Sequence, residues 1–344
     1  MEYFGGLEKS KPAVRNPFEL GRAAMEAYKW NEAIGHFEEA MKHAAGTQLV
    51  ALHGLVGRSH HTPGRLHQAL ASYEESARLA GQFQDKPGLA HALNHVGVVL
   101  RDLGKHDHAL EKYEAALKLA QEASARPQEA LSLNNIGAFH YVEGEPAKAL
   151  RYYEDALKIH QETGDRYGQA MVLCNIAITL PCVENGKLDK ALESCEQALA
   201  LAREIGAKYV EASALGNLGF LHWDKGDRGK TLGYSEAALK LFREVGAKRG
   251  EASLLANLGG ILIESGEHEQ AIGRFLAAQS TYSVPGTIEG PERYRHGLGR
   301  CLYALGRERF VAACVKAGKS KHEAEKLANE LASPEEVARR RSHP

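Results

Sequence analysis

The chain has 344 residues, with 43 Lys and Arg against 44 Asp and Glu, so its formal net charge is −1. This balance argues against a dedicated nucleic-acid-binding protein, because such proteins usually carry a strong basic excess. No run reaches the roughly eighteen apolar residues of a membrane span, and the first residues lack the apolar stretch of a secretory signal. Five cysteines in a chain of this length do not form a disulfide framework, so we expect a cytoplasmic protein.

The first predicted helix begins near residue 17. Residues 16–19 read Asn-Pro-Phe-Glu, a capping-box arrangement with proline at the first helical position. The preceding segment, residues 1–16, has no pattern that would fold on its own, and we assign it as an N-terminal extension. We expect it to pack on the first helix pair or on a partner chain.

A small residue then recurs at a fixed interval. Gly57, Gly97 and Gly137 are 40 residues apart, as are Gly219 and Gly259, and alanine takes the slot between them. A second glycine usually follows seven residues later, where a first helix must end and the chain must turn back. A period of this size indicates a solenoid of stacked repeats.

The second half of each repeat has its own columns. A small residue is followed four positions later by an aromatic or small one, and three further on by Ala116, Ala156 or Ala238. Spacings of three, four and seven place these residues on one face of a helix. We therefore expect two antiparallel helices per repeat, with these alanines buried where the helices cross.

These columns resemble the tetratricopeptide repeat. The period of 40 residues and the linkers at 162–166 and 244–248 are similar to the long-helix variety in Pins-type adaptors, in Rap-type regulators and, more distantly, in kinesin light chains. The resemblance covers roughly residues 17–305. It implies an all-α, right-handed α-solenoid superhelix of about fourteen to sixteen helices in antiparallel pairs.

The domain organisation follows from the repeats. We expect seven repeats and a degenerate eighth helix within residues 17–305, then closing helices and a basic tail in residues 306–344. Two further capping boxes begin at Ser320 and Ser333 and predict the closing helices. Pro181 stands in the last turn of a predicted first helix, beside a two-residue insertion, and predicts an early exit from that helix. The alternatives are a tolerated loop insertion and a bend in the superhelix.

The resemblance also implies that the first helices line a concave groove. The column two positions before the repeat glycine points into that groove and contains Asn135, Asn175, Asn217 and Asn257. An amide side chain can donate to and accept from one peptide unit, so this ladder could hold a bound segment by its backbone. Alternatively, the amides bond between neighbouring helices and only shape the array.

The rest of the predicted groove changes character along the chain. Its early part is positive or carries imidazoles, with Arg58, His91, His95 and Arg101, whereas its later part offers Tyr141 and Trp223. A partner with acidic residues at one end and apolar anchors at the other would suit such a groove. The alternative is a solvated surface without this order.

Metal binding and catalysis find little support. His91 and His95 have the spacing of a zinc pair, but no nearby cysteine or carboxylate completes a site, so we expect no metal and no cofactor. We find no paired catalytic groups and expect a non-catalytic protein.

The sequence thus favours a scaffold or adaptor that binds a peptide or partner protein in its concave groove, with no nucleic-acid or membrane partner. The alternative is a peptide-sensing or regulatory subunit. It would control a partner enzyme (a protease, a kinase or phosphatase, or an ATPase) by compaction of the superhelix. A further variant is a subunit of a larger complex.

Overall fold

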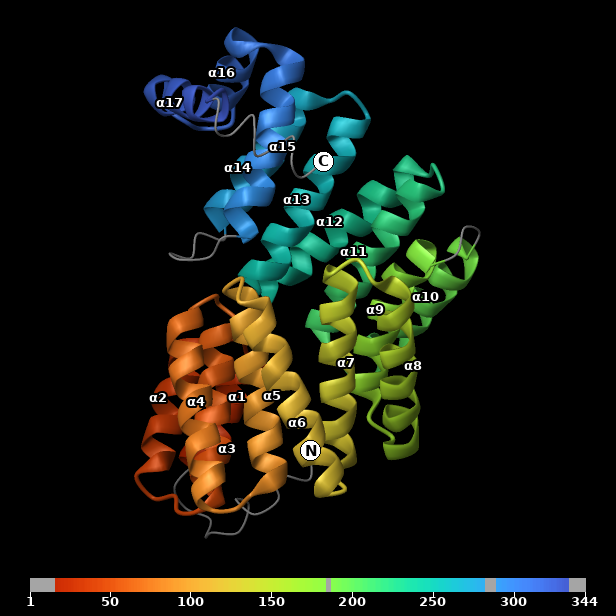
Figure 1. Ribbon diagram of the computed structural model, residues 1–344. Coiled ribbons are helices and arrows are strands. Elements are labelled where there is room, and N and C mark those ends of the chain that lie inside the picture. Colours follow the sequence, from red (N-terminus) through yellow and green to blue (C-terminus); the bar gives the residue numbers. More distant parts are fainter. Residues whose placement is uncertain (1–15, 184–186, 282–288, 334–344) are drawn as a thin grey trace. The chain divides into compact units, whose positions relative to one another are not determined.

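The computed structural model describes residues 16–183, 187–281 and 289–333, and these contain seventeen α-helices and no strand (Figure 1). The first six helices are α1 (Pro17–Glu26), α2 (Trp30–Met41), α3 (Thr47–His61), α4 (Leu66–Gln82), α5 (Lys86–Asp102) and α6 (His106–Glu122). The next six are α7 (Arg126–Val142), α8 (Pro146–Thr163), α9 (Arg166–Val183), α10 (Leu188–Glu204), α11 (Lys208–Asp224) and α12 (Arg228–Glu244). The last five are α13 (Lys248–Glu264), α14 (His268–Thr281), α15 (Glu289–Leu305), α16 (Arg307–Lys316) and α17 (Lys321–Leu331).

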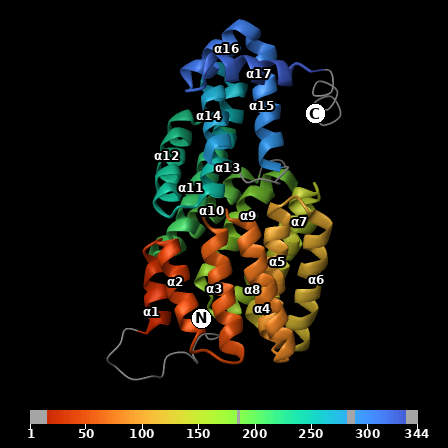
Figure 2. The same ribbon diagram turned by 90° about the vertical axis from the view of Figure 1, so that its left-hand side faces the viewer.

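The chain divides into two compact units. Unit 1 is Met1–Ala247 and contains α1 to α12, while unit 2 is Lys248–Pro344 and contains α13 to α17. In each unit, consecutive helices pack against one another as hairpins (Figure 2). The predicted all-α solenoid of helix pairs is confirmed, with fifteen helices, α1 to α15, between residues 17 and 305. None of the described helices is long and apolar enough to cross a membrane.

The repeating glycines are explained by the rings that cover them. A Cβ atom added at Gly97 would lie 2.5 Å from the ring of Tyr113, and one at Gly137 would lie 2.8 Å from the ring of Tyr153. In these repeats the aromatic residue of the second helix therefore lies directly on the backbone of the first helix, where a glycine leaves room for the ring. The predicted burial of Ala116, Ala156 and Ala238 is also confirmed, since each is 0% exposed.

The predicted helix ends are correct at some points and wrong at others. Helix α1 begins at Pro17, and the Asn16 side chain accepts a hydrogen bond from the Phe18 backbone N–H. The early exit predicted at Pro181 is wrong, because α9 continues through this residue to Val183. A proline removes only one backbone donor, and so near the end of a helix it affects only the last turn. The insertion itself includes residues 184–186, which lie outside the described residues.

The carboxy-terminal helices follow the sequence more closely. Helix α17 begins at a complete capping box between Ser320 and Glu323, and it packs against α15 and α16. Its apolar face is buried through Ala324, Leu327, Ala328 and Leu331. The helix predicted after Ser333, the basic tail and residues 1–15 of the predicted extension lie outside the described part of the chain.

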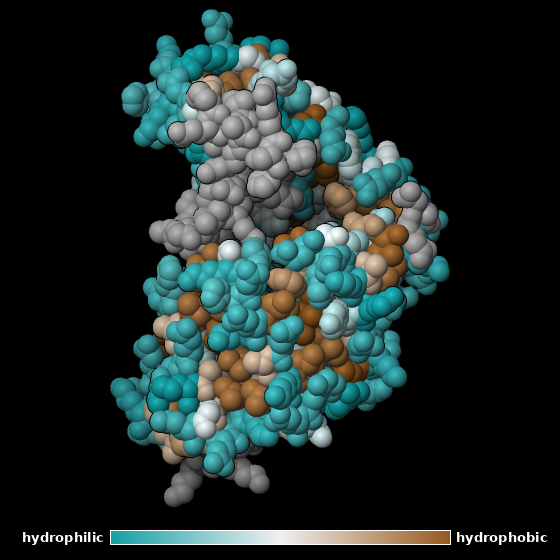
Figure 3. All heavy atoms as spheres, in the orientation of Figure 1, coloured by the Kyte–Doolittle hydropathy of each residue, from teal (hydrophilic) through white to brown (hydrophobic). Residues whose placement is uncertain are grey.

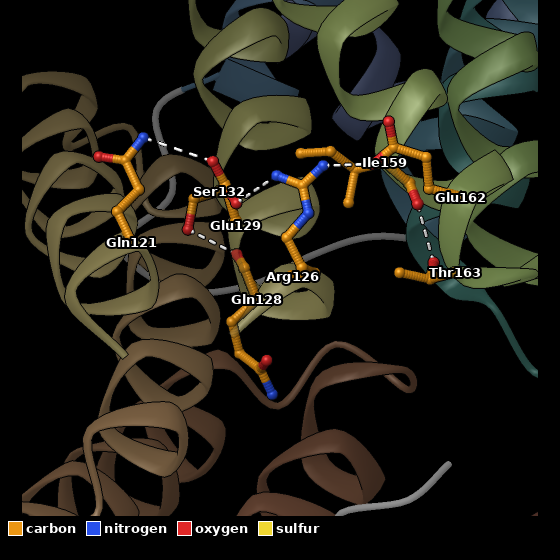
Figure 4. Close-up of polar contacts among 8 residues, drawn as sticks. All are labelled: Gln121, Arg126, Gln128, Glu129, Ser132, Ile159, Glu162 and Thr163. Carbon is orange, nitrogen blue, oxygen red and sulfur yellow. Dashed lines mark hydrogen bonds and ion pairs between the residues drawn. The ribbon is translucent and has the colours of Figure 1, made fainter. Parts of the chain in front are cut away.

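An ion pair joins the two ends of the helix hairpin in four successive repeats. Arg126, at the start of α7, contacts Glu129 at 2.8 Å and Glu162, near the end of α8, at 2.5 Å (Figure 4). The equivalent pairs in the other three repeats are Lys86–Glu122, Arg166–Glu204 and Lys208–Glu244. Because these pairs are largely exposed, each adds little stability, but together they fix which helix ends meet.

Candidate functional site

The residues predicted to line the groove all lie on first helices of the repeats, and nine of the ten are in unit 1. They are Arg58 on α3; His91, His95 and Arg101 on α5; Asn135 and Tyr141 on α7; Asn175 on α9; and Asn217 and Trp223 on α11. Asn257 is on α13 and belongs to unit 2.

The asparagine amides of unit 1 bond to neighbouring first helices. Asn135 donates to Oδ1 of Asn94 at 3.1 Å, and Asn175 donates to Oδ1 of Asn134 at 2.9 Å. Asn217 donates to the backbone carbonyl of Cys174, also at 3.1 Å. The groove hypothesis expected these three amides to be free for a ligand, and they are not free. Their bonds agree with the alternative that the amides join neighbouring helices and shape the array. Asn135 is only 5% exposed, whereas Asn175 and Asn217 are half-buried.

Two histidines and a tyrosine form a packed cluster between α4 and α5. The ring of His95 stacks on Tyr73 with 4.9 Å between centroids, and the ring of His91 meets His95 edge-on at 4.6 Å. Burial and the nearby Arg58 guanidinium lower the pKa of His91 to about 4. Burial, followed by His91, His61 and Arg58, also holds the pKa of His95 well below its usual value. Both imidazoles are therefore neutral at pH 7.

Arg58 is the charge that this cluster faces. Its side chain is exposed and makes no ion pair with any residue that the structure describes. Neighbouring groups raise the pKa of Tyr167, first by desolvating it and then through Tyr209, while Arg58 acts in the opposite direction. Arg58 on α3 is thus electrostatically close to Tyr167 on α9, although two helix hairpins separate them in the sequence.

The second arginine of this surface is held by a buried carboxylate. Asp102, whose side chain is fully buried, accepts from Arg101 Nη2 at 3.3 Å and lies 2.9 Å from Nε2 of His61. Burial alone would lower the pKa of Arg101, but the Asp102 carboxylate raises it, so the guanidinium stays charged. The charge of Arg101 is offset, and that of Arg58 is not.

Tyr167 and Tyr209 are site residues that the sequence analysis missed. They are 50% and 40% exposed, and both take the second position of a first helix, where the earlier repeats have Pro87 and Pro127. The change from proline to tyrosine at this position of the repeat was the one sequence signal that could have identified them. We call this surface the inner face of unit 1, defined by Arg58, His91, His95, Arg101, Tyr167 and Tyr209.

The predicted aromatic end of the groove lies at the turns. Trp223, at the end of α11, carries the guanidinium of Arg228 over its ring at 5.6 Å, across the turn to α12. Tyr141 is half-buried at the end of α7. Both residues lie at the ends of first helices, whereas the neutral histidines of the inner face lie in the middle of α5.

The inner face therefore combines a free guanidinium with aromatic rings and neutral imidazoles. Such a surface can bind an anionic group and pack apolar side chains beside it. No group of three or more His, Cys, Asp or Glu side chains that could hold a metal ion occurs in the described residues. On the face that Figure 3 presents, apolar residues gather over the middle of unit 1, with hydrophilic residues around them.

Solved structures share this fold at low sequence identity. A Rap protein complexed with competence and sporulation factor is 16% identical, with a TM-score of 0.59, and the match covers 95% of this chain and 94% of that one. The Rap conjugation gene regulator of the plasmid pLS20, in complex with a Phr peptide, is 15% identical, with a TM-score of 0.67 and coverage of 89% and 84%. At this identity the likeness shows the fold. No curated protein matches the chain in sequence.

The sequence also matches a known family of repeat proteins. The tetratricopeptide-repeat pattern is found at residues 47–122, 128–204 and 210–282. The matched segments begin with α3 and take in the helix pairs up to α14. Since they span more than half of its length, the chain belongs to the tetratricopeptide-repeat family.

Proposed function

We propose that the chain is a non-catalytic scaffold or adaptor that binds a peptide, or an extended segment of a partner protein, on the inner face of unit 1. The proposal rests on one observation, the exposed positive charge of Arg58, which is unpaired among the described residues. Its unpaired guanidinium lies among side chains from α4, α5 and α9, which do not neutralise it. A charge in such a place favours a ligand that brings an opposite charge.

The ligand should therefore carry a carboxylate for Arg58 and apolar side chains for the surrounding rings. Tyr167 and Tyr209 offer large, partly exposed aromatic surfaces, which are enriched among the residues that dominate binding energy. The amides of Asn175 and Asn217 are half-buried, so they can still contact a ligand backbone while they join two helices. Asn135 has little surface left for this purpose.

The fold similarity supports the same type of ligand. Two solved structures with this architecture hold a peptide or a competence and sporulation factor. Fold alone does not determine function, so the support is for the class of ligand and leaves its sequence open. We extend this class to the present chain because its inner face offers an exposed guanidinium at Arg58 and partly exposed rings at Tyr167 and Tyr209.

The test is a selection of random heptapeptides displayed on phage, with the whole chain as bait. Isothermal titration calorimetry of the best binder against wild type, Arg58→Gln and Arg151→Gln follows. Arg151 on α8 is the matched control, because it is also exposed and also has no ion pair among the described residues. A charge-assisted hydrogen bond predicts about tenfold to hundredfold weaker binding for Arg58→Gln.

The outcomes are separable. Selected peptides rich in Asp or Glu, with affinity lost in Arg58→Gln and retained in Arg151→Gln, support the proposal. Binders that are indifferent to Arg58 would place the ligand elsewhere on the chain. If repeated selection gives no binder, peptide recognition itself is refuted.

A regulatory role is the second candidate. One observation favours it: unit 1 contains a contact between its first and its later repeats, near Tyr28 and Lys208. A regulator that controls a partner enzyme by compaction needs a contact that can open and close between distant repeats, whereas a rigid adaptor does not. Small-angle scattering with and without the selected peptide separates them, since a regulator should change its radius of gyration and a rigid adaptor should keep it.

A further inference from the structure

The turn between α1 and α2 touches helix ends that lie far away in the sequence. The ammonium of Lys208, at the start of α11, lies over the ring of Tyr28 at 5.8 Å. A Cβ atom on Gly246, just after α12, would lie 3.1 Å from Nε1 of Trp30. Both views of the ribbon show the end of α12 beside this turn (Figures 1 and 2). All four residues belong to unit 1.

Tyr28 occupies a position that glycine takes in later repeats. Its φ angle is +59°, and the equivalent turn residues Gly64, Gly104 and Gly144 have φ angles of +87°, +75° and +76°. A tyrosine in this left-handed region costs about 1–2 kcal/mol, which glycine avoids. The first repeat therefore accepts backbone strain at the residue whose ring meets Lys208. Strain of this kind persists where the surroundings hold it, and it points to a role.

The contact beside Tyr28 is not fully satisfied. Nε1 of Trp30 is buried and has no hydrogen-bond partner, although the indole ring packs near Tyr28 at 6.1 Å. A buried donor without an acceptor opposes closure, because water would satisfy it when the contact opens. The contact also includes few residues. A small contact with an internal penalty can open and close within a folded protein.

We propose that the turn carrying Tyr28 and Trp30 is a releasable clasp that closes unit 1 onto Lys208 and Gly246 and thereby controls the width of the inner face. The control of binding rests on the function proposed above, whereas the clasp itself does not.

The inner face has residues on two pairs of helices, α3 with α5 and α9 with α11, which we call its two walls. These walls explain how the clasp and the ligand would be coupled. Arg58 on α3 influences the pKa of Tyr167 on α9, and Tyr209 on α11 influences the pKa of Arg101 on α5, so charged or polar groups of these helices lie within electrostatic reach of one another. The clasp links the hairpin that precedes α3 to the start of α11 and the end of α12, since α1 and α2 precede α3, Lys208 begins α11 and Gly246 follows α12. A ligand that touches both walls binds best when the clasp is closed, and by reciprocity it holds the clasp closed.

The first measurement needs no ligand. Trp30 and Trp223 are the two tryptophans of the chain, so a Trp223→Phe background leaves Trp30 as the only indole reporter. In this background, Gly246→Asn should push against the indole, shift its emission to the red and increase quenching by acrylamide. Gly206→Asn is the control: Gly206 has φ +67°, like the +66° of Gly246, but nothing lies within 4 Å of its Cβ position. Asparagine tolerates this region. Equal emission and quenching in both variants would overturn the clasp.

The second measurement uses Tyr28→Gly in the otherwise native chain. Glycine should relax the turn, so thermal stability should hold or rise, while the contact with Lys208 is lost. For a peptide selected on the wild type, the affinity should fall about fivefold or more, the lower range of allosteric coupling. An unchanged affinity would refute control of the inner face by the clasp. If no peptide binds, the proposed function fails, and the Trp30 measurement alone decides the clasp.

Discussion

At the residue scale, the structure depends on close approach between paired helices, and neighbouring glycines provide a direct test. A Cβ atom at Gly259 would lie 2.7 Å from the ring of Phe275, whereas nothing lies within 4 Å of the Cβ position of Gly260. We expect Gly259→Ala to destabilise the protein by about 1–3 kcal/mol through overpacking. Gly260→Ala should be neutral or stabilising by up to about 1 kcal/mol, because alanine favours helix. Urea unfolding of both variants checks this, and equal stabilities would contradict the assigned packing.

The neutral histidines of the inner face predict a loss of stability in acid. An unfolded histidine titrates near its ordinary pKa of 6.5, while that of His91 is lowered to about 4 in the folded chain. The unfolded state therefore binds more protons between these values, so this contribution is complete above about pH 6.5 and is lost as the pH falls towards 4. The double variant His91→Gln, His95→Gln should show a shallower fall in melting temperature over this range. A slope identical to that of the wild type would exclude these residues as the cause.

Asn135 was predicted to contact a ligand, but its amide instead joins two helices of the array. Its amide is nearly buried and bonds to Asn94, so Asn135→Ala would leave a buried acceptor without its donor. We expect a loss of about 1–3 kcal/mol in thermal or chemical unfolding. Asn175→Ala, at a half-buried position, should cost less because water can replace the amide. The opposite order of stabilities would contradict this account.

At the scale of the helix, caps and terminal packing complete the array. Helix α17 covers α15 and α16 with an apolar face that includes Leu327 and Leu331. A chain that ends at residue 319 should therefore expose apolar surface and form oligomers, measurable by light scattering. The milder variant Ser320→Ala loses the capping box and should cost about 1 kcal/mol without oligomers. A truncated chain that stays monomeric and equally stable would show that α17 is dispensable.

The sequence predicted the helices because their signals are repeated and local. Six copies of one column set reveal the hairpin, and the capping box at Ser320 identifies a helix start without any tertiary information. The early exit predicted at Pro181 was wrong because the effect of a proline depends on how far the helix continues beyond it, and α9 ends two residues later. The residues of the inner face were harder to predict from the sequence than the helix ends. Tyr167 lies within electrostatic reach of Arg58, and an influence across three repeats leaves no mark in local periodicity. Tyr28 did break the glycine column, but its partner Lys208 could not be identified from the sequence.

At the scale of the whole molecule, the two units have different roles. Unit 1 carries the inner face and both sides of the clasp, while unit 2 carries Asn257 and the closing helices. Ligand binding should therefore protect backbone amides of α3, α5, α9 and α11 in hydrogen exchange, and it should leave α16 and α17 unchanged. Protection confined to unit 2 would place the site there and would contradict the proposed division.

The central claim is that a peptide binds on the inner face, and photocrosslinking tests it most directly. A photoreactive phenylalanine analogue is placed at position 167 on α9 or, as the control, at position 151 on α8. Both native side chains are exposed, so either position should accept the analogue. With a peptide selected on the wild type, we predict a crosslink at position 167, located by mass spectrometry, and none at position 151. A crosslink at position 151 with none at position 167 would contradict the account.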